Sequence, residues 1–238
     1  MSRRRSSSPS APSRVAAGYL VLQQPGAESP DFAVVVDDIR ALLAGTYKTA
    51  DGVALSATPG VGADIELWLF GSSGGQSAQL AGELGLPFVA NYHVSPGTTI
   101  EAVEGYRRAF RPSERYPEPY VVVSADVVVA ESDAEARRRA ATFGHWVHSI
   151  RTGHGAIPYP DPATAVPLSA EQAAVVQDRL DTQFVGSPDT VVERLGALQR
   201  LTGADELVVT SVTHSHEDRL ESHRLLARAW GLSGLRAA

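Results

Sequence analysis

The sequence WLFGSSGGQSAQLAGELGLPF, residues 68–88, contains the pattern that decides the fold. An apolar run ends in five consecutive small residues, 71–75, and an amphipathic segment follows. A strand that leads through such a turn into a helix is typical of β-α units in parallel sheets. The first amides of such a helix and its dipole favour an anion, and glycines let the backbone approach it. The loop therefore predicts either a phosphate site or a plain tight turn.

Two familiar nucleotide-binding motifs do not fit this loop. No Gly-Lys-Ser/Thr follows it, so it is not a P-loop, and Gly71, Gly74 and Gly75 do not have the spacing of G-x-G-x-x-G. A phosphate at this position would instead depend on helix amides and on serine hydroxyls.

Strands and helices are predicted to alternate from residue 65 onward, which indicates a parallel sheet covered by helices. Strands are expected at residues 65–70, 87–92, 120–130 and 206–213, and helices at residues 75–84, 98–110, 132–150 and 216–229. Ser132 and Ser169 begin capping boxes, and Ser187-Pro188 begins a further helix. Residues 151–168 are rich in proline and are predicted to form an insertion loop. A complete (β/α)8 barrel takes about 250 residues, so four or five strands indicate an open sheet or part of a barrel.

The N-terminal part has a different composition. Residues 1–13 form a basic Ser/Pro/Arg stretch that is predicted to be a disordered tail, and residues 14–238 are expected to form a single α/β domain. Residues 14–24 are read as a strand or the end of a helix. Residues 31–44 have helical spacing and end at Gly45, and a loop with a small hairpin at Asp51-Gly52 is expected to follow.

The composition excludes several classes of protein. The net charge of −6 argues against a general nucleic-acid-binding surface, and no apolar run reaches the length of a membrane span. The chain has no cysteine, which excludes disulfides and thiolate zinc sites and fits a cytoplasmic protein. Its seven histidines do not form an H-E-x-x-H motif, so no metal site is predicted.

Four segments in the same order resemble the bacterial-luciferase-like flavin monooxygenases. They are GSSGGQSAQLAGELGLPFVANYH (71–93), FGHWVHSI (143–150), FVGSPDTVVERL (184–195) and TGADELVVTSVTHSHEDRLESHRLLA (202–227). This resemblance implies a parallel (β/α) barrel of the TIM type. It also implies a monooxygenase that uses O2, a small organic substrate and reduced FMN supplied by a separate flavin reductase. The deazaflavin coenzyme F420 is the alternative cofactor.

The resemblance also assigns candidate site residues. Ser73, Gly74 and Ser77, with Ser72 nearby, match the positions that receive the flavin phosphate in this family, and Tyr92 matches a residue against the flavin ring.

Two histidines are the candidate catalytic residues. His93 ends the next predicted strand, where a histidine can transfer protons near neutral pH, although the position favours a role in structural packing. His214 ends the last predicted strand, at the face where barrel active sites are built.

The chain departs from the family pattern before residue 65. Nothing in residues 1–64 resembles the first four β-α units, so the chain is expected to hold an incomplete barrel, about the last four β-α units behind an N-terminal extension. An open half barrel exposes two sheet edges, and pairing as a homodimer or with another barrel chain is therefore expected. The alternative function is a noncatalytic flavin-binding or dimerisation half barrel, a truncated homologue.

Overall fold

A computed structural model describes residues 31–232 of the chain. The chain divides into two compact units, Met1–Glu66 and Leu67–Ala238, which are described separately below. The tail expected at residues 1–13 and the element expected at residues 14–24 lie outside the described residues. The expectation of one domain over residues 14–238 stays a prediction.

The first unit is built around helix α2 (Phe32–Ala44). Its first turn is capped by Asp31, whose carboxylate accepts a hydrogen bond of 2.9 Å from the amide of Ala33. The helix ends at Gly45, which adopts the left-handed conformation that glycine favours at this position (φ +71°). An antiparallel bridge between Lys48 and Ala54 then closes a small hairpin. The structure confirms both the helix and the hairpin that the sequence predicts.

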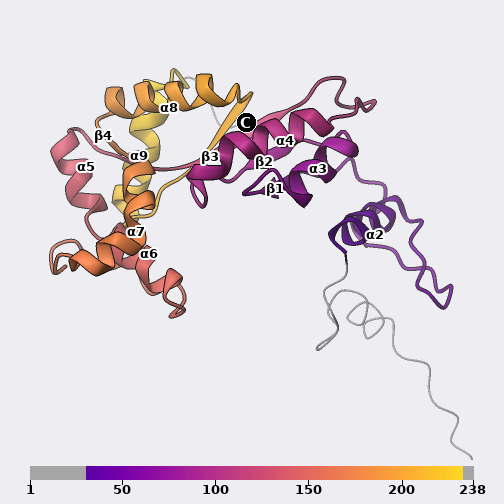
Figure 1. Cartoon of the computed structure of the whole chain (residues 1–238), viewed down its shortest axis with the longest axis horizontal. Helices are drawn as coiled ribbons and strands as arrows, with labels where there is room; N and C mark the ends of the chain where they lie inside the picture. The colour runs from indigo at the N-terminus through magenta and orange to yellow at the C-terminus, as the bar shows by residue number, and fades with distance from the viewer. Residues whose placement is uncertain (1–30, 233–238) are drawn as a thin grey trace, which may run out of the picture. The chain divides into compact units, whose positions relative to one another are not determined.

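The second unit contains a parallel sheet of five strands (Figure 1). The strands are β1 (Leu69–Gly71), β2 (Phe88–Ala90), β3 (Val121–Val129), β4 (Phe184–Gly186) and β5 (Glu206–Thr210). β2 pairs with the start of β3, β5 pairs along the middle of β3, and β4 pairs with the end of β3. Every residue of β3 is buried, as expected for a central strand of a parallel sheet.

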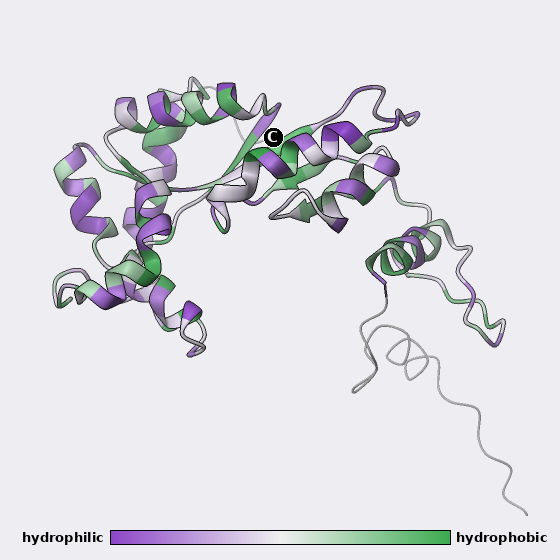
Figure 2. Cartoon of the chain, in the orientation of Figure 1, coloured by the Kyte–Doolittle hydropathy of each residue, from purple (hydrophilic) through white to green (hydrophobic). Residues whose placement is uncertain are grey.

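Helices follow the strands in the expected alternation. They are α3 (Gln76–Glu83), the short 3-10 helix η1 (Pro96–Thr98), α4 (Thr99–Ala109), α5 (Asp133–Ala140), α6 (Phe143–Arg151), α7 (Ala170–Thr182), α8 (Pro188–Thr202) and α9 (His216–Ala229). Figure 2 shows apolar residues concentrated in β2 and β3, whereas α5 is largely polar. The parallel α/β class is thus confirmed, and the sheet is not closed into a barrel among residues 31–232.

The strand registers define two faces of the sheet. Leu69, Phe88 and Val121 lie in one row, and Phe88 stacks on Tyr106 of α4 at a ring distance of 5.4 Å. We call this helix-covered side the outer face. Phe70, Val89 and Val122 lie in the adjacent row and therefore point to the opposite side, which we call the inner face.

The second strand ends at Ala90 rather than at residue 92, the last strand ends at Thr210 rather than at residue 213, and three further elements differ from the sequence prediction. The first strand begins at Leu69 rather than at residue 65, because its partner β2 follows Pro87, which has no amide to extend the ladder. The strand β4 was not predicted. The helix expected at residues 132–150 is two helices, which separate at Ala141 and Thr142. The buried hydroxyl of Thr142 donates 2.8 Å to the carbonyl of Pro160 in the insertion loop, a tertiary contact that the helical pattern does not encode.

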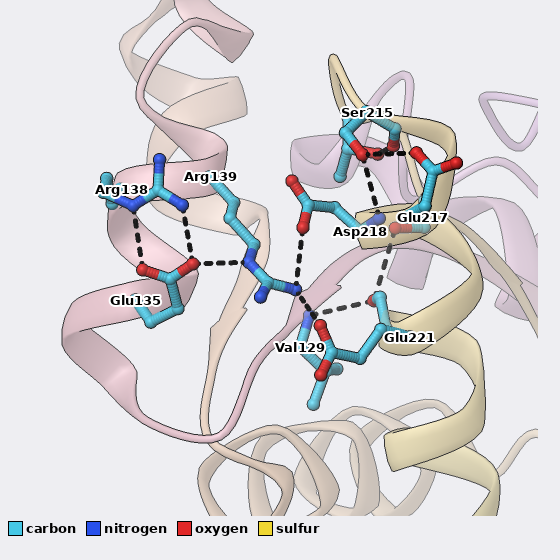
Figure 3. Close-up of polar contacts among 11 residues, drawn as sticks. Val129, Glu135, Arg138, Arg139, Ser215, Glu217, Asp218 and Glu221 are labelled. Carbon is cyan, nitrogen blue, oxygen red and sulfur yellow. Dashed lines mark hydrogen bonds and ion pairs between the residues drawn. The ribbon is translucent and has the colours of Figure 1, made fainter. Parts of the chain in front are cut away.

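A cluster of charges joins α5 to α9 (Figure 3). The side chain of Arg139 is 11% exposed, and its guanidinium contacts Glu135 at 2.7 Å, Asp218 at 3.2 Å and Glu221 at 2.6 Å. Hydrogen bonds from Arg138 and Arg139 hold the pKa of Glu135 at about 2, below its ordinary value. The cluster therefore keeps the helix after β3 against the helix after β5.

Candidate functional site

The Gly/Ser loop lies between the end of β1 and the start of α3. The hydroxyl of Thr98 in η1 donates to the carbonyl of Ser72. A Cβ on Gly74 would lie 2.9 Å from the carbonyl oxygen of Glu101, and a Cβ on Gly105 would lie 3.0 Å from the Cα of Gly74. The loop thus rests directly on α4, and only glycine fits at this contact.

In the described chain, α3, like α4 and α6, begins without a side-chain cap, whereas five other helices have one. Side chains at the N-cap positions of α2, α5, α7, α8 and α9 accept hydrogen bonds from first-turn amides; they are Asp31, Ser132, Ser169, Ser187 and Ser215. The N-cap residue of α3 is Gly75, which has no side chain. Ser73 is exposed, and Ser72, Gly74 and Ser77 are partly exposed. An anion bound at this point would take the role of a side-chain cap.

Tyr92 and His93 follow the end of β2. The ring of Tyr92 lies 5.8 Å from that of Phe184, and burial raises the pKa of its phenol. The Nδ1 atom of His93 lies 2.5 Å from the hydroxyl of Ser124, which is buried on the inner face of β3.

An ion pair adjoins His93. Asp126 and Arg179 are 3.0 Å apart, and their side chains are 7% and 12% exposed. The hydroxyl of Thr210 donates to the other oxygen of Asp126, and the guanidinium of Arg179 lies 5.5 Å from the ring centre of Phe143. We call the group His93, Ser124, Asp126, Arg179 and Thr210 the inner polar cluster.

The inner polar cluster determines the charge of His93. Burial lowers the pKa of His93, the negative charge of Asp126 opposes this shift, and the positive charge of Arg179 reinforces it. The imidazole is therefore neutral over a wider pH range than a free histidine. One ring nitrogen is engaged by Ser124, and the other nitrogen can accept or donate a proton.

Four members of this cluster were not predicted. Ser124 and Asp126 are two residues apart in a strand that is otherwise rich in valine, and this spacing places both on one face. That signal was available in the sequence. Arg179 and Thr210 gave no comparable signal, because each lies in a segment where an exposed polar side chain is ordinary.

His214 has different neighbours from His93. Its Nδ1 donates 3.0 Å to the carbonyl of Tyr159, and its Nε2 lies 4.0 Å from Asp161. Both partners belong to the insertion loop, and the ring is about half exposed. The two predicted catalytic histidines therefore have no hydrogen-bond partner in common, and His214 holds the insertion loop.

A separate cavity of about 530 Å³ lies between α8, α9 and β5. Leu195, Leu207, Val209, Leu226 and Trp230 provide most of its apolar lining, with His223 among its polar residues. Neither the Gly/Ser loop nor His93 lines this cavity. Within residues 31–232, no three His, Cys, Asp or Glu side chains are grouped to hold a metal ion. None of the helices in that range is long and apolar enough to cross a membrane.

Comparison with known proteins identifies one matching family. Residues 26–206 match the family described as luciferase-like monooxygenase. A protein from Escherichia coli (strain K12) named luciferase-like monooxygenase is 34% identical over 168 residues, which are 70% of this chain and 50% of that protein. The uncharacterized protein YvbT of Bacillus subtilis (strain 168) is 37% identical over 203 residues, which are 84% of this chain and 59% of YvbT.

A solved structure is likewise similar to this chain over part of its own length. The crystal structure of apo-MsnO8 has 33% sequence identity and a TM-score of 0.66, and the match covers 86% of this chain and 61% of MsnO8. The chain therefore spans between half and two thirds of the length of the relatives that it matches.

Proposed function

The chain belongs to the luciferase-like monooxygenase family, and from this premise we propose that it acts in a flavin-dependent oxidation of a small organic molecule by O2. In this proposal FMN is the cofactor, and the deazaflavin coenzyme F420 is the alternative. When bound in its reduced form, the flavin supplies the electrons that activate O2. The residues described here bind the cofactor and control protons beside it.

The Gly/Ser loop carries the proposal. Ser72, Ser73, Gly74 and Ser77 lie around the start of a helix whose N-cap position has no side chain. A phosphate at this point would accept hydrogen bonds from the first turn of α3 and from the serine hydroxyls, and the helix dipole would favour its charge. The donors that a phosphate group requires are thus present in the loop.

The remaining site residues have roles next to this phosphate. Tyr92, at the end of the neighbouring strand, is assigned to the flavin ring. His93 is assigned to proton transfer, because its pKa is lowered and one of its nitrogens is fixed by Ser124. His214 is the second candidate, and it acts from the side of the insertion loop.

The proposal includes partners and a location. Reduced flavin comes from a separate reductase in the cytoplasm. A further chain, either a second copy or another barrel chain, covers the open edges of the sheet.

Titration of the purified chain with oxidised and reduced FMN tests this proposal. We expect quenching of flavin fluorescence and calorimetric heat at micromolar FMN. The variants Ser73→Ala and Ser77→Ala should each weaken binding about fivefold, since a neutral hydrogen bond is worth about 1 kcal/mol. Ser56→Ala, an exposed serine of the first unit, is the matched control and should bind as the unmodified chain does. A chain that shows no signal at high micromolar FMN and F420 would rule the proposal out.

A further inference from the structure

The parallel sheet of the second unit ends in two strands that each have one neighbour. Within the described residues, β1 pairs only with β2, and β5 pairs only with β3. Leaving aside the short β4, the strands run side by side in the order β1-β2-β3-β5, and all are parallel. Unpaired edges of this kind expose rows of backbone amides and carbonyls that can pair with a further parallel strand.

The inner face of the same sheet has exposed apolar side chains at these edges. Phe70 of β1 is 58% exposed, and Val208 of β5 is 39% exposed, whereas Val89 and Val122 between them are fully buried. Trp68 and Tyr120 lie on the same side with their rings 6.0 Å apart, and the Tyr120 hydroxyl donates 3.1 Å to Glu206. Large apolar side chains are therefore least covered where the sheet ends.

The inner face is layered along the strands. Its lower part, toward the start of the strands, holds Trp68, Phe70 and Tyr120, together with Glu206, which is paired with Val122. Its upper part, toward their carboxyl ends, holds the inner polar cluster, in which Asp126 and Arg179 neutralise each other. Val208 is paired with Ser124, so this upper part also has an apolar side chain at the edge of the sheet.

We propose that this inner face packs against the inner face of a second copy of the chain, so that β5 of each copy pairs with β1 of the other. A two-fold axis along the strand direction keeps every residue at its own height, so the aromatic side chains of the lower part meet those of the other copy, and the inner polar cluster meets its own copy. The same axis places β5 beside the partner's β1 in parallel orientation, and both open edges close at once. The result is a closed ring of eight parallel strands whose interior is filled by layers of side chains, as in other barrels of this size.

This assembly explains the exposed edge residues without invoking any ligand, so it stands or fails independently of flavin binding. It also completes the candidate site, because the inner polar cluster would then lie inside a barrel rather than on an open sheet. A second copy fits this surface better than an unrelated protein, because one copy closes both parallel edges by the same contact.

Cysteine cross-linking tests the arrangement directly, since the chain has no cysteine of its own. Adjacent strands lie about 4.8 Å apart, within the reach of a disulfide. Chains carrying Phe70→Cys, mixed with chains carrying Val208→Cys or Glu206→Cys and then oxidised, should give a covalent dimer. Each variant oxidised alone should give little covalent dimer, because the two copies of its cysteine lie on opposite sides of the barrel. Two positions on β5 allow for either register.

A control cysteine on another surface and the mass of the assembly in solution complete the experiment. Leu201→Cys lies on the exposed side of α8, where it is 71% exposed, and it should not cross-link to Phe70→Cys. Sedimentation of the unmodified chain, of mass 25.2 kDa, should give a species of twice that mass. A monomer at tens of micromolar would overturn the proposal. So would a dimer in which Leu201→Cys cross-links as well as the β5 cysteines, or one that forms only after another barrel chain is added.

Discussion

At the scale of single residues, the inner polar cluster shows how a histidine is kept neutral. His93 is buried against Ser124, and the charges of Asp126 and Arg179 act on it in opposite directions. Because the pKa of His93 in the folded chain is below its ordinary value of 6.5, the unfolded chain binds a proton first as the pH falls. The contribution of His93 to stability is therefore complete above pH 6.5 and is lost as the pH falls from 6.5 toward the lowered pKa.

The variant Arg179→Gln tests this interpretation. It removes the positive charge that lowers the pKa of His93 and leaves the negative charge of Asp126, which raises it, so the pKa of His93 should rise. The measurement is the titration of the His93 ring signals by NMR. Arg200→Gln, an exposed arginine on α8, is the control and should leave the curve in place. An unchanged or lower pKa in Arg179→Gln would show that the ion pair does not act on His93.

At the scale of elements, the ends of helices were predicted well and the strands less well. Ser132, Ser169 and Ser187 act as caps as the sequence predicts, because capping depends on residues within three or four positions of each other. The short β4 and the break at Thr142 depend on partners far along the chain, at Val127 and Pro160 respectively. The local sequence pattern could not predict either feature. In the same way the sequence predicted His93 as a site residue but not Arg179, which contacts Asp126 from α7.

The contact between the Gly/Ser loop and α4 leads to a prediction about packing. A methyl group at Gly105 would meet the backbone of Gly74 at 3.0 Å, and backbone atoms cannot move aside as a flexible side chain can. Gly105→Ala should therefore destabilise the fold by about 1–2 kcal/mol, despite the better helix propensity of alanine. It should also weaken FMN binding, because the loop must shift. Denaturant unfolding and the FMN titration measure the two effects.

Gly97→Ala is the matched control for this prediction. Gly97 lies in η1 beside the same loop, and a Cβ there would have no atom within 4 Å. The free energy of unfolding of Gly97→Ala should differ from that of the unmodified chain by less than about 0.5 kcal/mol. Equal behaviour of the two variants would mean that the close approach at Gly105 has no energetic consequence.

At the scale of the whole molecule, alternation of strands and helices was sufficient to predict a parallel sheet but not its closure. Strand order and edges depend on long-range pairing, and the sequence from residue 65 onward specifies four main strands with a short fifth. The exposed Phe70 and Val208 are the physical sign that the second unit is not complete by itself. In a monomer these side chains would remain in water at a cost of about 25 cal/mol for each Å² of apolar surface.

A dimer closed through the inner face makes thermal stability depend on concentration. Mass action favours the folded dimer over two unfolded chains. A tenfold rise in chain concentration therefore stabilises the dimer against unfolding by about 1.4 kcal/mol. For two chains of this size the midpoint should then rise by about 2 °C for each tenfold step. Val208→Lys places a charge on the inner face at the edge strand β5, where the second copy would pair, and should abolish both the dimer and this dependence. Leu201→Lys, on the exposed side of α8, should preserve both. Calorimetry over a hundredfold range of concentration measures the effect, and a midpoint that stays constant for the unmodified chain would show that the second unit is stable with its inner face open.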